Sequence, residues 1–313
     1  MDKIHILITM DVEPALEATT RPDGASGPLD YEQSDRFIRG YARRAAARGY
    51  PVSYMLHPEV TAHHARLFLD LEAEGACLGL HIHPWKFGDG HYKAHFGGLS
   101  AEQQCAILSE ASAVWYGNMG KRPRYFRPGT FSANDNTFGV LERLGFLGGS
   151  VSIPGRVYPD LNAVWAGAAL DPHRANDAFR QVPGNLNFVN IPLSVDVSGV
   201  EDRGGRKFHW DLRPDWVNAD YRCIARNIVS QVLSRDPEVP VVHMVTHNDN
   251  DYSDDEDRVC RNFETVLDQI AIACREAGRE PVGATFADIV GLLHGNAHRR
   301  RDFVFADSTM LTG

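Results

Sequence analysis

The stretch Lys3-Ile4-His5-Ile6-Leu7-Ile8-Thr9-Met10-Asp11-Val12-Glu13-Pro14 decides the fold that we expect for this chain. The apolar run at residues 4–10 predicts a buried strand, and two carboxylates follow it directly. Side chains at positions i and i+2 of an extended chain share one face, so Asp11 and Glu13 should project together. α/β folds place their sites at this end of a strand, although the same pattern also occurs in surface turns. Two carboxylates this close repel each other, so we expect a cation between them.

Short apolar runs alternate with segments of helical spacing along the rest of the chain. The runs lie at 4–10, 51–56, 77–82, 124–127, 146–152, 240–246 and 282–286. The helical segments include 37–45, 67–71, 138–144 and 263–272, and a capping box at 100–103 opens another that reaches residue 115. This alternation predicts a single α/β domain over residues 1–313, with a mainly parallel sheet that is open or closed into a barrel.

The segment from 154 to 220 interrupts this alternation. It is rich in glycine, proline, asparagine and aspartate and contains one strand-like run, residues 187–193. We interpret it as an irregular functional insertion. Its aromatic side chains, which include Trp165, Trp210 and Trp216, either stack on a ligand or fill a small core of the insertion itself. A tail is expected at 295–313, and its basic run at 298–301 is interpreted as solvated.

The composition argues against several classes of protein. Of the 313 residues 32 are basic and 41 are acidic, and the net charge of −9 argues against a nucleic-acid polymer as partner. No apolar stretch approaches the ~18 residues of a membrane-spanning helix, and the first residues lack the pattern of a signal peptide. The five cysteines form no CxxC pair, which argues against a disulfide framework and a cysteine-type zinc site. We therefore expect a cytoplasmic protein.

Two histidines follow another predicted strand, in the stretch Gly79-Leu80-His81-Ile82-His83-Pro84-Trp85. Their i, i+2 spacing places both imidazoles on one face, where they can bind zinc or a similar divalent ion. A pair of satisfied core histidines is the structural alternative. His91 and His95 follow in a glycine-rich loop, where they either approach the same site or lie exposed.

Two further strands end in residues that suit a catalytic site. Arg127 ends the apolar run at 124–127, and the Pro-Gly turn after it suits a fixed bidentate contact to a carboxylate. His247 ends the run Val242-His243-Met244-Val245-Thr246-His247, and an acidic segment at 249–257 follows it. This segment lacks the glycine and the terminal glutamate of an EF-hand, so we do not interpret it as a calcium site. All these groups should meet at one rim of a barrel.

The order of these motifs resembles that of the polysaccharide deacetylases, also called the NodB-homology family or carbohydrate esterase family 4. The resemblance runs from residue 4 to about residue 290. It is carried by Thr-x-Asp-x-Glu at 9–13, Gly-Leu-His at 79–81 with a further histidine, Phe-Arg-Pro at 126–128 and the strand that ends in His247. It implies a distorted, incompletely closed (β/α) barrel of seven or eight strands. The implied reaction is metal-dependent removal of an acyl group from an N-acylated sugar.

The resemblance also implies catalytic roles. Asp11 corresponds to the base that activates a water molecule, Arg127 to the arginine that orients this base, and His247 to the general acid. Because the first residues lack a signal-peptide pattern and the cysteine usage indicates the cytoplasm, we expect the substrate to be an intracellular precursor. Our hypothesis is an N-acetyl or N-formyl sugar, nucleotide- or lipid-linked, for a bacterial surface polysaccharide. The oligomeric state is left open.

The implied ligands of one divalent ion, with zinc as the preferred ion, are Glu13, His81 and His83. This set departs from the common pattern of the family, because Val12 stands at the usual aspartate position and Trp85 at the usual position of the second histidine. The alternative ligands are His91, His95 and His173.

Two other functions compete with this interpretation. An amidohydrolase-like metal hydrolase acting on another amide also uses an HxH pair, but there the pair normally ends the first strand. Here the first strand ends in Asp11-Val12-Glu13, and the pair comes about 70 residues later. The other alternative is a catalytically inactive sugar-binding protein on the same barrel. The joint presence of base, arginine and acid candidates argues against it.

Overall fold

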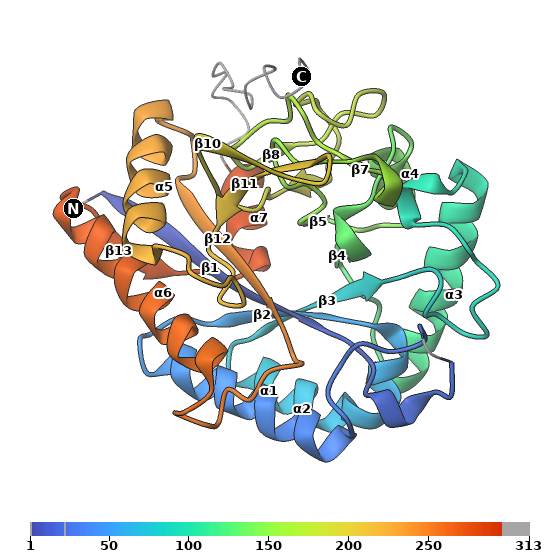
Figure 1. The fold of residues 1–313 in the computed structure, drawn as a ribbon. Coiled ribbons are helices and arrows are strands. Elements are labelled where there is room, and N and C mark those ends of the chain that lie inside the picture. The colour runs from blue at the N-terminus through green and yellow to red at the C-terminus, as the bar shows by residue number, and fades with distance from the viewer. Residues whose placement is uncertain (1, 22, 296–313) are drawn as a thin grey trace.

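Strand β1 (Lys3–Val12) lies inside a curled, nine-stranded sheet in the computed structural model, which describes residues 2–21 and 23–295 (Figure 1). The order of hydrogen-bonded strands is β12-β1-β2-β3-β4-β5-β9-β8, and β13 also pairs with β1. All these pairs are parallel except β8 with β9. Within the described residues the two ends of the order, β8 and β12, do not pair, so the barrel is open, as the resemblance implied.

Strand β1 has 10 residues and β12 has 7, and the other strands of this sheet are shorter. The strands besides β1 are β2 (Val52–Leu56), β3 (Cys77–Ile82), β4 (Tyr125–Pro128), β5 (Gly148–Gly149), β8 (His173–Arg174), β9 (Val189–Asn190), β12 (Val241–His247) and β13 (Glu280–Gly283). Each of the seven predicted apolar runs overlaps one of the strands or, at 282–286, the end of β13 and the residues after it. The predicted strand–helix alternation is therefore confirmed.

The two faces of β1 lie in different environments. The side chains that pack with the outer helices are Ile4, Ile6, Ile8, Met10 and Val12. Leu7 belongs to a separate buried cluster on the opposite face. Thr9 and Asp11 share that face with Leu7, because side chains alternate along a strand. The same strand therefore anchors the sheet to its helices and carries polar groups into the barrel.

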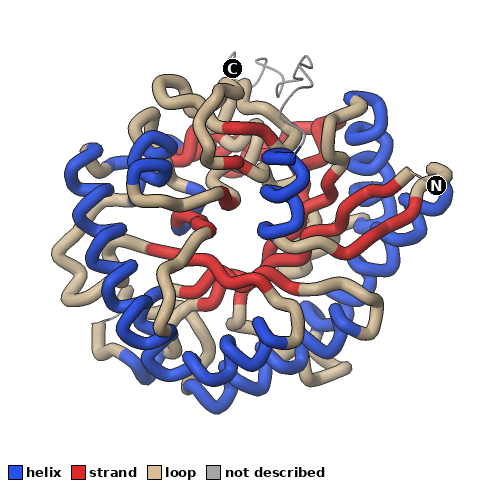
Figure 2. The backbone as a smooth tube through the Cα atoms, turned by 180° about the vertical axis from the view of Figure 1, so that it is seen from behind, coloured by secondary structure: helices blue, strands red, loops and turns tan. Residues whose placement is uncertain are grey.

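Helices cover the outside of the sheet, as Figure 2 shows from behind. They are α1 (Tyr31–Ala46), α2 (Thr61–Ala73), α3 (Ala101–Met119), α4 (Thr137–Arg143), α5 (Tyr221–Arg235) and α6 (Arg258–Glu276). The capping box predicted at the start of α3 is present, since the Ser100 hydroxyl accepts from the Gln103 N–H and the Gln103 side chain accepts from the Ser100 N–H. Helix α5 was not predicted from the sequence, although Asp220 caps it by accepting from the Cys223 N–H.

Helix α7 (Phe286–Gly295) closes the end of the barrel opposite to Asp11. Its buried residues Phe286, Ile289, Val290 and Leu293 share a cluster with residues of five strands. The strand residues of this cluster are Leu7 of β1, Met55 of β2, Cys77 of β3, Val189 of β9 and Val241 of β12. The barrel interior is thus apolar at this end and polar at the end where β1 carries its carboxylates.

The segment 154–220 contains more regular structure than its sequence predicted. A second, antiparallel sheet has the strand order β10-β11-β6-β7. Its strands are β10 (Val195–Arg203), β11 (Arg206–Asp211), β6 (Val157–Tyr158) and β7 (Ala163–Val164). The one predicted strand, at 187–193, contains β9 and belongs to the main sheet. The hairpin β10–β11 escaped prediction because most of β10 is exposed and polar, which leaves no apolar alternation to detect.

The tryptophans of this insertion pack within the protein. Trp165 is fully buried, and its Nε1 donates to the Phe131 carbonyl at 2.7 Å. Trp216 stacks on Phe208 and lies edge-on to Trp210, with ring centroids 5.4 and 5.2 Å apart. These aromatic residues therefore pack inside the protein, but not in a core of the insertion alone, because Trp165 belongs to the main core and Trp210 and Trp216 pack against it.

The C-terminal segment differs slightly from its prediction. Helix α7 continues to Gly295, so the expected tail can begin only after that residue. Its basic run at 298–301 lies outside the described residues. In the described ranges, none of the helices combines the length and apolar character that crossing a membrane requires.

The packing of α7 predicts which of its residues stabilise the barrel. Ile289→Ala should lower the free energy of unfolding by about 2–5 kcal/mol, because Ile289 is fully buried in the cluster with the strands. Leu292→Ala on the same helix is the matched control, since 38% of Leu292 is exposed. Urea unfolding followed by circular dichroism measures both. Equal losses for the two variants would contradict the packing described for α7.

Candidate metal centre and catalytic residues

Asp11 and Arg127 form a buried ion pair at the carboxyl end of the sheet. Arg127 Nη1 donates to Asp11 Oδ1 at 2.5 Å, and 3% of Asp11 and none of Arg127 is exposed. Arg127 lies on β4, three strands from β1, so its side chain crosses the interior of the barrel. Burial raises the pKa of Asp11, but the neighbouring cationic groups, among which Arg127 contributes most, together outweigh this effect and hold the pKa below its usual value. Asp11 is therefore an ionised acceptor held in one orientation.

A third strand contributes His243 to this pair. Arg127 Nη2 lies 2.9 Å from both the Thr9 hydroxyl and His243 Nε2. His243 Nδ1 lies 3.0 Å from the Pro192 carbonyl, which can only accept, so we assign the ring proton to Nδ1 and let Nε2 accept from Arg127. Burial, followed by the charge of Arg127, lowers the pKa of His243 to about 3 and keeps the ring neutral. His243 was not among the predicted site residues, although strand alternation places it on the same face as His247.

Glu13, His81 and His83 converge beside the ion pair. His81 Nε2 and His83 Nε2 lie 3.2 and 2.8 Å from Glu13 Oε1, and all three side chains are buried. Burial opposes the ionisation of Glu13, but the adjacent Lys86 ammonium counteracts this effect, and the pKa of the carboxyl stays well below its usual value. Burial lowers the pKa of His83 to about 4, so its ring is neutral at pH 7. The three predicted ligands are thus brought together as one anionic group and two imidazoles.

This donor set fits a divalent ion. His81 Nδ1 lies 3.0 Å from the Arg127 carbonyl and must donate to it, so a neutral His81 presents the lone pair of Nε2 to Glu13. Two acceptors 3.2 Å apart need a proton or a metal ion between them. The three ligand atoms lie within 4.8 Å of one another, and no other group of this kind exists in the described part of the chain. A carboxylate with two imidazoles is a common catalytic zinc set.

Lys86, which the sequence analysis did not select, lies at the same carboxylate. Its Nζ donates to Glu13 Oε2 at 2.9 Å and to the Ser26 hydroxyl at 2.6 Å, and the residue is buried. We expected one cation between the two carboxylates. Instead each carboxylate has its own cation, Arg127 for Asp11 and Lys86 for Glu13. No spacing rule signals Lys86, because it lies in the turn after β3 and belongs to no periodic element.

Asn248, also absent from the sequence analysis, fixes the backbone of Glu13. Its Oδ1 accepts from the Glu13 N–H at 2.9 Å, and its Nδ2 donates to the Glu13 carbonyl at 3.1 Å. Nδ2 also donates to the Ser34 hydroxyl at 3.1 Å, and Asn248 is fully buried. The residue directly after His247 therefore sets the position of a ligand that lies 235 positions earlier in the chain.

The turn after β4 bounds the site on the side of His83. Gly129 lies so close to His83 that an added Cβ would stand 2.3 Å from its Nδ1. Thr130 and Phe131 adopt left-handed φ angles of 57° and 56°, which cost of order 1–3 kcal/mol each for residues other than glycine. Trp165 of the insertion holds this conformation by donating to the Phe131 carbonyl. The insertion thus fixes a strained turn beside the candidate ligands.

His247 lies at the rim, half-buried, as its place at the strand end predicted. It pairs in register with Asp11 on the neighbouring strand. Asp249, which is exposed, is near enough for the two charges to interact. Asp251 is engaged elsewhere, because it accepts from Arg36 of α1 at 3.0 Å. Of the two acidic neighbours, Asp249 is therefore the one that can influence His247.

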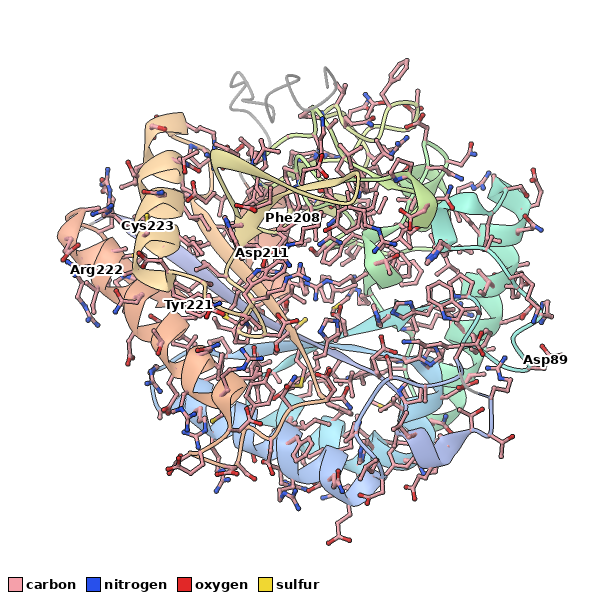
Figure 3. The ribbon with its side chains drawn as sticks, viewed as in Figure 1. Asp89, Phe208, Asp211, Tyr221, Arg222 and Cys223 are labelled. Carbon is pink, nitrogen blue, oxygen red and sulfur yellow. The ribbon has the colours of Figure 1, made fainter. Side chains whose placement is uncertain are left out.

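The alternative ligand histidines do not join the cluster. His91 is exposed and pairs with Asp89, which Figure 3 shows at the outer edge of the molecule. His95 lies edge-on to Trp85 at 4.4 Å, and Trp85 in turn lies edge-on to His83 at 4.7 Å, so His95 contacts the ring beside His83 and not the candidate ligands. His173 is buried on β8, where its Nδ1 bonds to the Asp171 carbonyl.

The fold is one that solved structures of carbohydrate deacetylases share. A protein described as a polysaccharide deacetylase from Mycobacterium smegmatis superposes with a TM-score of 0.58 at 13% identity, over 98% of this chain and 95% of that chain. A second protein so described, from Pseudomonas aeruginosa, gives 0.53 at 12% identity, over 95% and 93%. The allantoinase PuuE gives 0.57 at 14% identity, over 95% and 92%. No family model and no curated protein matches the sequence. The fold implied by the motif resemblance is thereby confirmed.

The geometry of the cluster predicts how metal binding responds to substitution. His81→Ala and His83→Ala should each weaken zinc binding tenfold or more, because each removes a ligand. Gly129→Ala should do the same, because its Cβ would displace the His83 ring. Isothermal titration of zinc into chelator-treated protein measures all three.

Two variants serve as controls for this measurement. His91→Ala removes an exposed histidine, and Gly117→Ala adds a Cβ on α3 that meets nothing within 4 Å. Both should bind zinc as the wild type does. Unchanged binding in His81→Ala and His83→Ala would overturn the ligand assignment.

Proposed function

We propose that this protein is a metal-dependent hydrolase that removes an acetyl or formyl group from the nitrogen of an amino sugar. The observation that carries the proposal is the adjacency, at one rim of a deacetylase-type barrel, of the Asp11–Arg127 pair and the Glu13, His81 and His83 group. His81 connects the two, because its Nδ1 lies 3.9 Å from Asp11 Oδ2 while its Nε2 faces Glu13.

The protein's own residues supply the proton transfers of this reaction. Asp11 accepts the proton of the water that attacks the amide carbon, and its lowered pKa keeps it ionised for this task. Arg127 holds the carboxylate in place, and its own position is fixed by Thr9 and His243. His247, in register with Asp11, donates the proton that turns the departing nitrogen into a neutral amine.

The remaining charge of the reaction develops on the carbonyl oxygen. A divalent ion bound by Glu13, His81 and His83, with zinc as the preferred ion, supplies a Lewis acid that polarises this carbonyl and lowers the pKa of water. A backbone N–H of the turn Gly129–Phe131 donates to the same oxygen. The strain of this turn, held by Trp165, supports such a positioning role.

The proposed substrate is a sugar precursor of a surface polysaccharide, linked to a nucleotide or a lipid, and the proposed compartment is the cytoplasm. All five cysteines are free thiols, which is typical of proteins that work in a reducing compartment.

A second candidate is hydrolysis of a non-sugar amide. It is favoured by the likeness to the allantoinase PuuE, which superposes about as well as the two deacetylases do. The TM-score is 0.57 for PuuE and 0.58 and 0.53 for the deacetylases. Release of acetate or formate from N-acetyl and N-formyl glucosamine derivatives, measured beside turnover of allantoin, distinguishes the two candidates. Turnover of allantoin alone would replace the sugar by a ureide as the substrate class.

The role of Asp11 can be tested on whichever amide is turned over. Asp11→Asn should lower kcat by about 10²–10⁴, the usual contribution of a positioned base, and leave zinc binding in place. Steady-state kinetics and metal analysis of the same preparation measure both. Asp254→Asn, at an exposed acidic residue, is the control. Full activity of Asp11→Asn would exclude Asp11 as the base.

His247 should matter more for poor leaving groups than for good ones. His247→Ala should lose about 10²–10⁴ in kcat on an amide, whose nitrogen must be protonated, and far less on an activated ester. Both substrates are compared in steady-state assays, with His91→Ala as the control. Equal losses on both substrates, or loss of the metal, would show that His247 is not the acid.

A further inference from the structure

We propose that Arg156 forms a subsite for an anionic group of the substrate, a carboxylate or a phosphate carried by the sugar next to the scissile amide. This inference rests on the proposed function and adds the charge of the substrate to it. Arg156 comes from the insertion and lies outside every motif that the sequence analysis selected.

Arg156 is a buried cation without a carboxylate. Only 6% of the residue is exposed, and no ion pair joins it to any acidic side chain in the ranges 2–21 and 23–295. Within the described residues its side chain makes one hydrogen bond, from Nη1 to the Thr130 carbonyl at 3.4 Å, and its buried Nε has no partner. A buried charge is costly unless it is paired. The missing counter-charge is therefore expected from outside the chain.

The neighbouring arginines show what Arg156 lacks. Arg127 is paired with Asp11, and Arg213 is paired with Asp211 through Nε and Nη2, both at 2.8 Å. Burial, and next the charge of Arg213, lower the pKa of Arg156 to about 10, so it remains protonated at pH 7. The charges within each of these two ion pairs cancel, and the positive charge of Arg156 is not compensated.

Asp211, the acidic residue whose charge acts on Arg156, is already engaged. It accepts from Arg213 and, at 2.9 Å, from Trp216 Nε1, and 1% of it is exposed. Figure 3 shows Asp211 and Phe208 on the side of the insertion, above the strands of the barrel. Asp211 could turn toward Arg156 only by leaving Arg213 unpaired. The cluster therefore cannot neutralise itself.

Arg156 lies one aromatic ring away from the catalytic pair. The guanidinium carbons of Arg127 and Arg156 stand 5.3 and 5.7 Å from the centre of the same Phe131 ring. The Thr130 carbonyl that Arg156 contacts belongs to the strained turn beside His83. An anion held by Arg156 would thus be a substituent of the molecule whose amide lies at Asp11.

The backbone presents Arg156 in a fixed position. Pro154 and Gly155, with φ of 77° at the glycine, form a turn closed by a hydrogen bond from Arg156 N to the Ile153 carbonyl at 3.1 Å. Trp165 N donates to the Arg156 carbonyl at 2.7 Å. The guanidinium also packs over the Tyr158 ring at 4.7 Å. A planar guanidinium held in this way suits the two parallel hydrogen bonds of a carboxylate or a phosphate.

Charge selectivity tests the proposal. Wild type and Arg156→Gln are assayed on N-acetylglucosamine 1-phosphate, on N-acetylglucosaminuronic acid and on the neutral methyl glycoside of N-acetylglucosamine. The ratio of kcat/KM for an anionic over the neutral substrate should fall about tenfold to a hundredfold in Arg156→Gln, as expected for loss of a charge-assisted hydrogen bond. The anionic sugar whose ratio falls identifies phosphate or carboxylate as the group recognised. Arg156→Lys, which keeps the charge without the planar fork, should show an intermediate ratio.

The control is Arg206→Gln, which breaks an exposed ion pair with Asp160 in the same insertion and should leave the ratio unchanged. A ratio that stays constant in Arg156→Gln, with kcat/KM falling equally on all substrates, would show that Arg156 only braces the Thr130 turn. If Arg156→Gln does not fold, absence of any preference for anionic sugars in the wild type and in Arg156→Lys overturns the proposal.

A binding measurement separates this proposal from the proposed function. Inorganic phosphate and glucuronate are titrated into chelator-treated, metal-free protein by calorimetry. Saturable binding of either probe to wild type and Arg206→Gln, lost in Arg156→Gln, supports the subsite even if no N-acyl sugar is hydrolysed. Wild-type protein that binds neither probe overturns it, whatever amide the enzyme hydrolyses.

Discussion

The buried ion pair between Asp11 and Arg127 is the constraint on which the rest of the site depends. It joins β1 to β4 across the barrel, and through Nη2 of Arg127 it also holds His243 of β12. Removing one partner of such a pair leaves an uncompensated buried charge, which typically costs about 3–5 kcal/mol. The Arg127 backbone takes part as well, because its carbonyl fixes the ring of His81. One residue therefore orients both the candidate base and a candidate ligand.

The sequence predicted those parts of this arrangement that follow from strand geometry. Asp11, Glu13, His81, His83 and Arg127 each end or follow an apolar run, and the carboxyl ends of parallel strands meet at one rim. Alternation along β12 would have identified His243 as well, had it been applied to the whole run. The open barrel and its outer helices follow from the same patterns, because the runs are apolar on both faces.

Other features could not be predicted, because they depend on contacts between segments that share no pattern. Lys86 contacts Glu13 from an irregular turn, and Asn248 contacts it from 235 positions later in the chain. The hairpin β10–β11 is stabilised by packing of Phe208, Trp210 and Trp216 on one another, which a strand pattern does not encode. Arg156 is unusual because no carboxylate among the described residues pairs with it. The sequence does not show which side chains will surround it, so this feature could not be predicted.

The pairing of β1 also has a consequence for the way in which the chain is made. This strand leaves the ribosome before its partners, and two of these three partners, β12 (residues 241–247) and β13 (residues 280–283), follow only after most of the other strands. Until residues 241–283 have been synthesised, one edge of β1 has no strand to bind, and its apolar residues remain exposed to other chains. Pairings this distant in sequence are formed late and slowly, and unpaired edges promote aggregation meanwhile. Yield in the cell should therefore depend on how well the nascent chain is protected during this interval, as much as on the stability of the finished barrel.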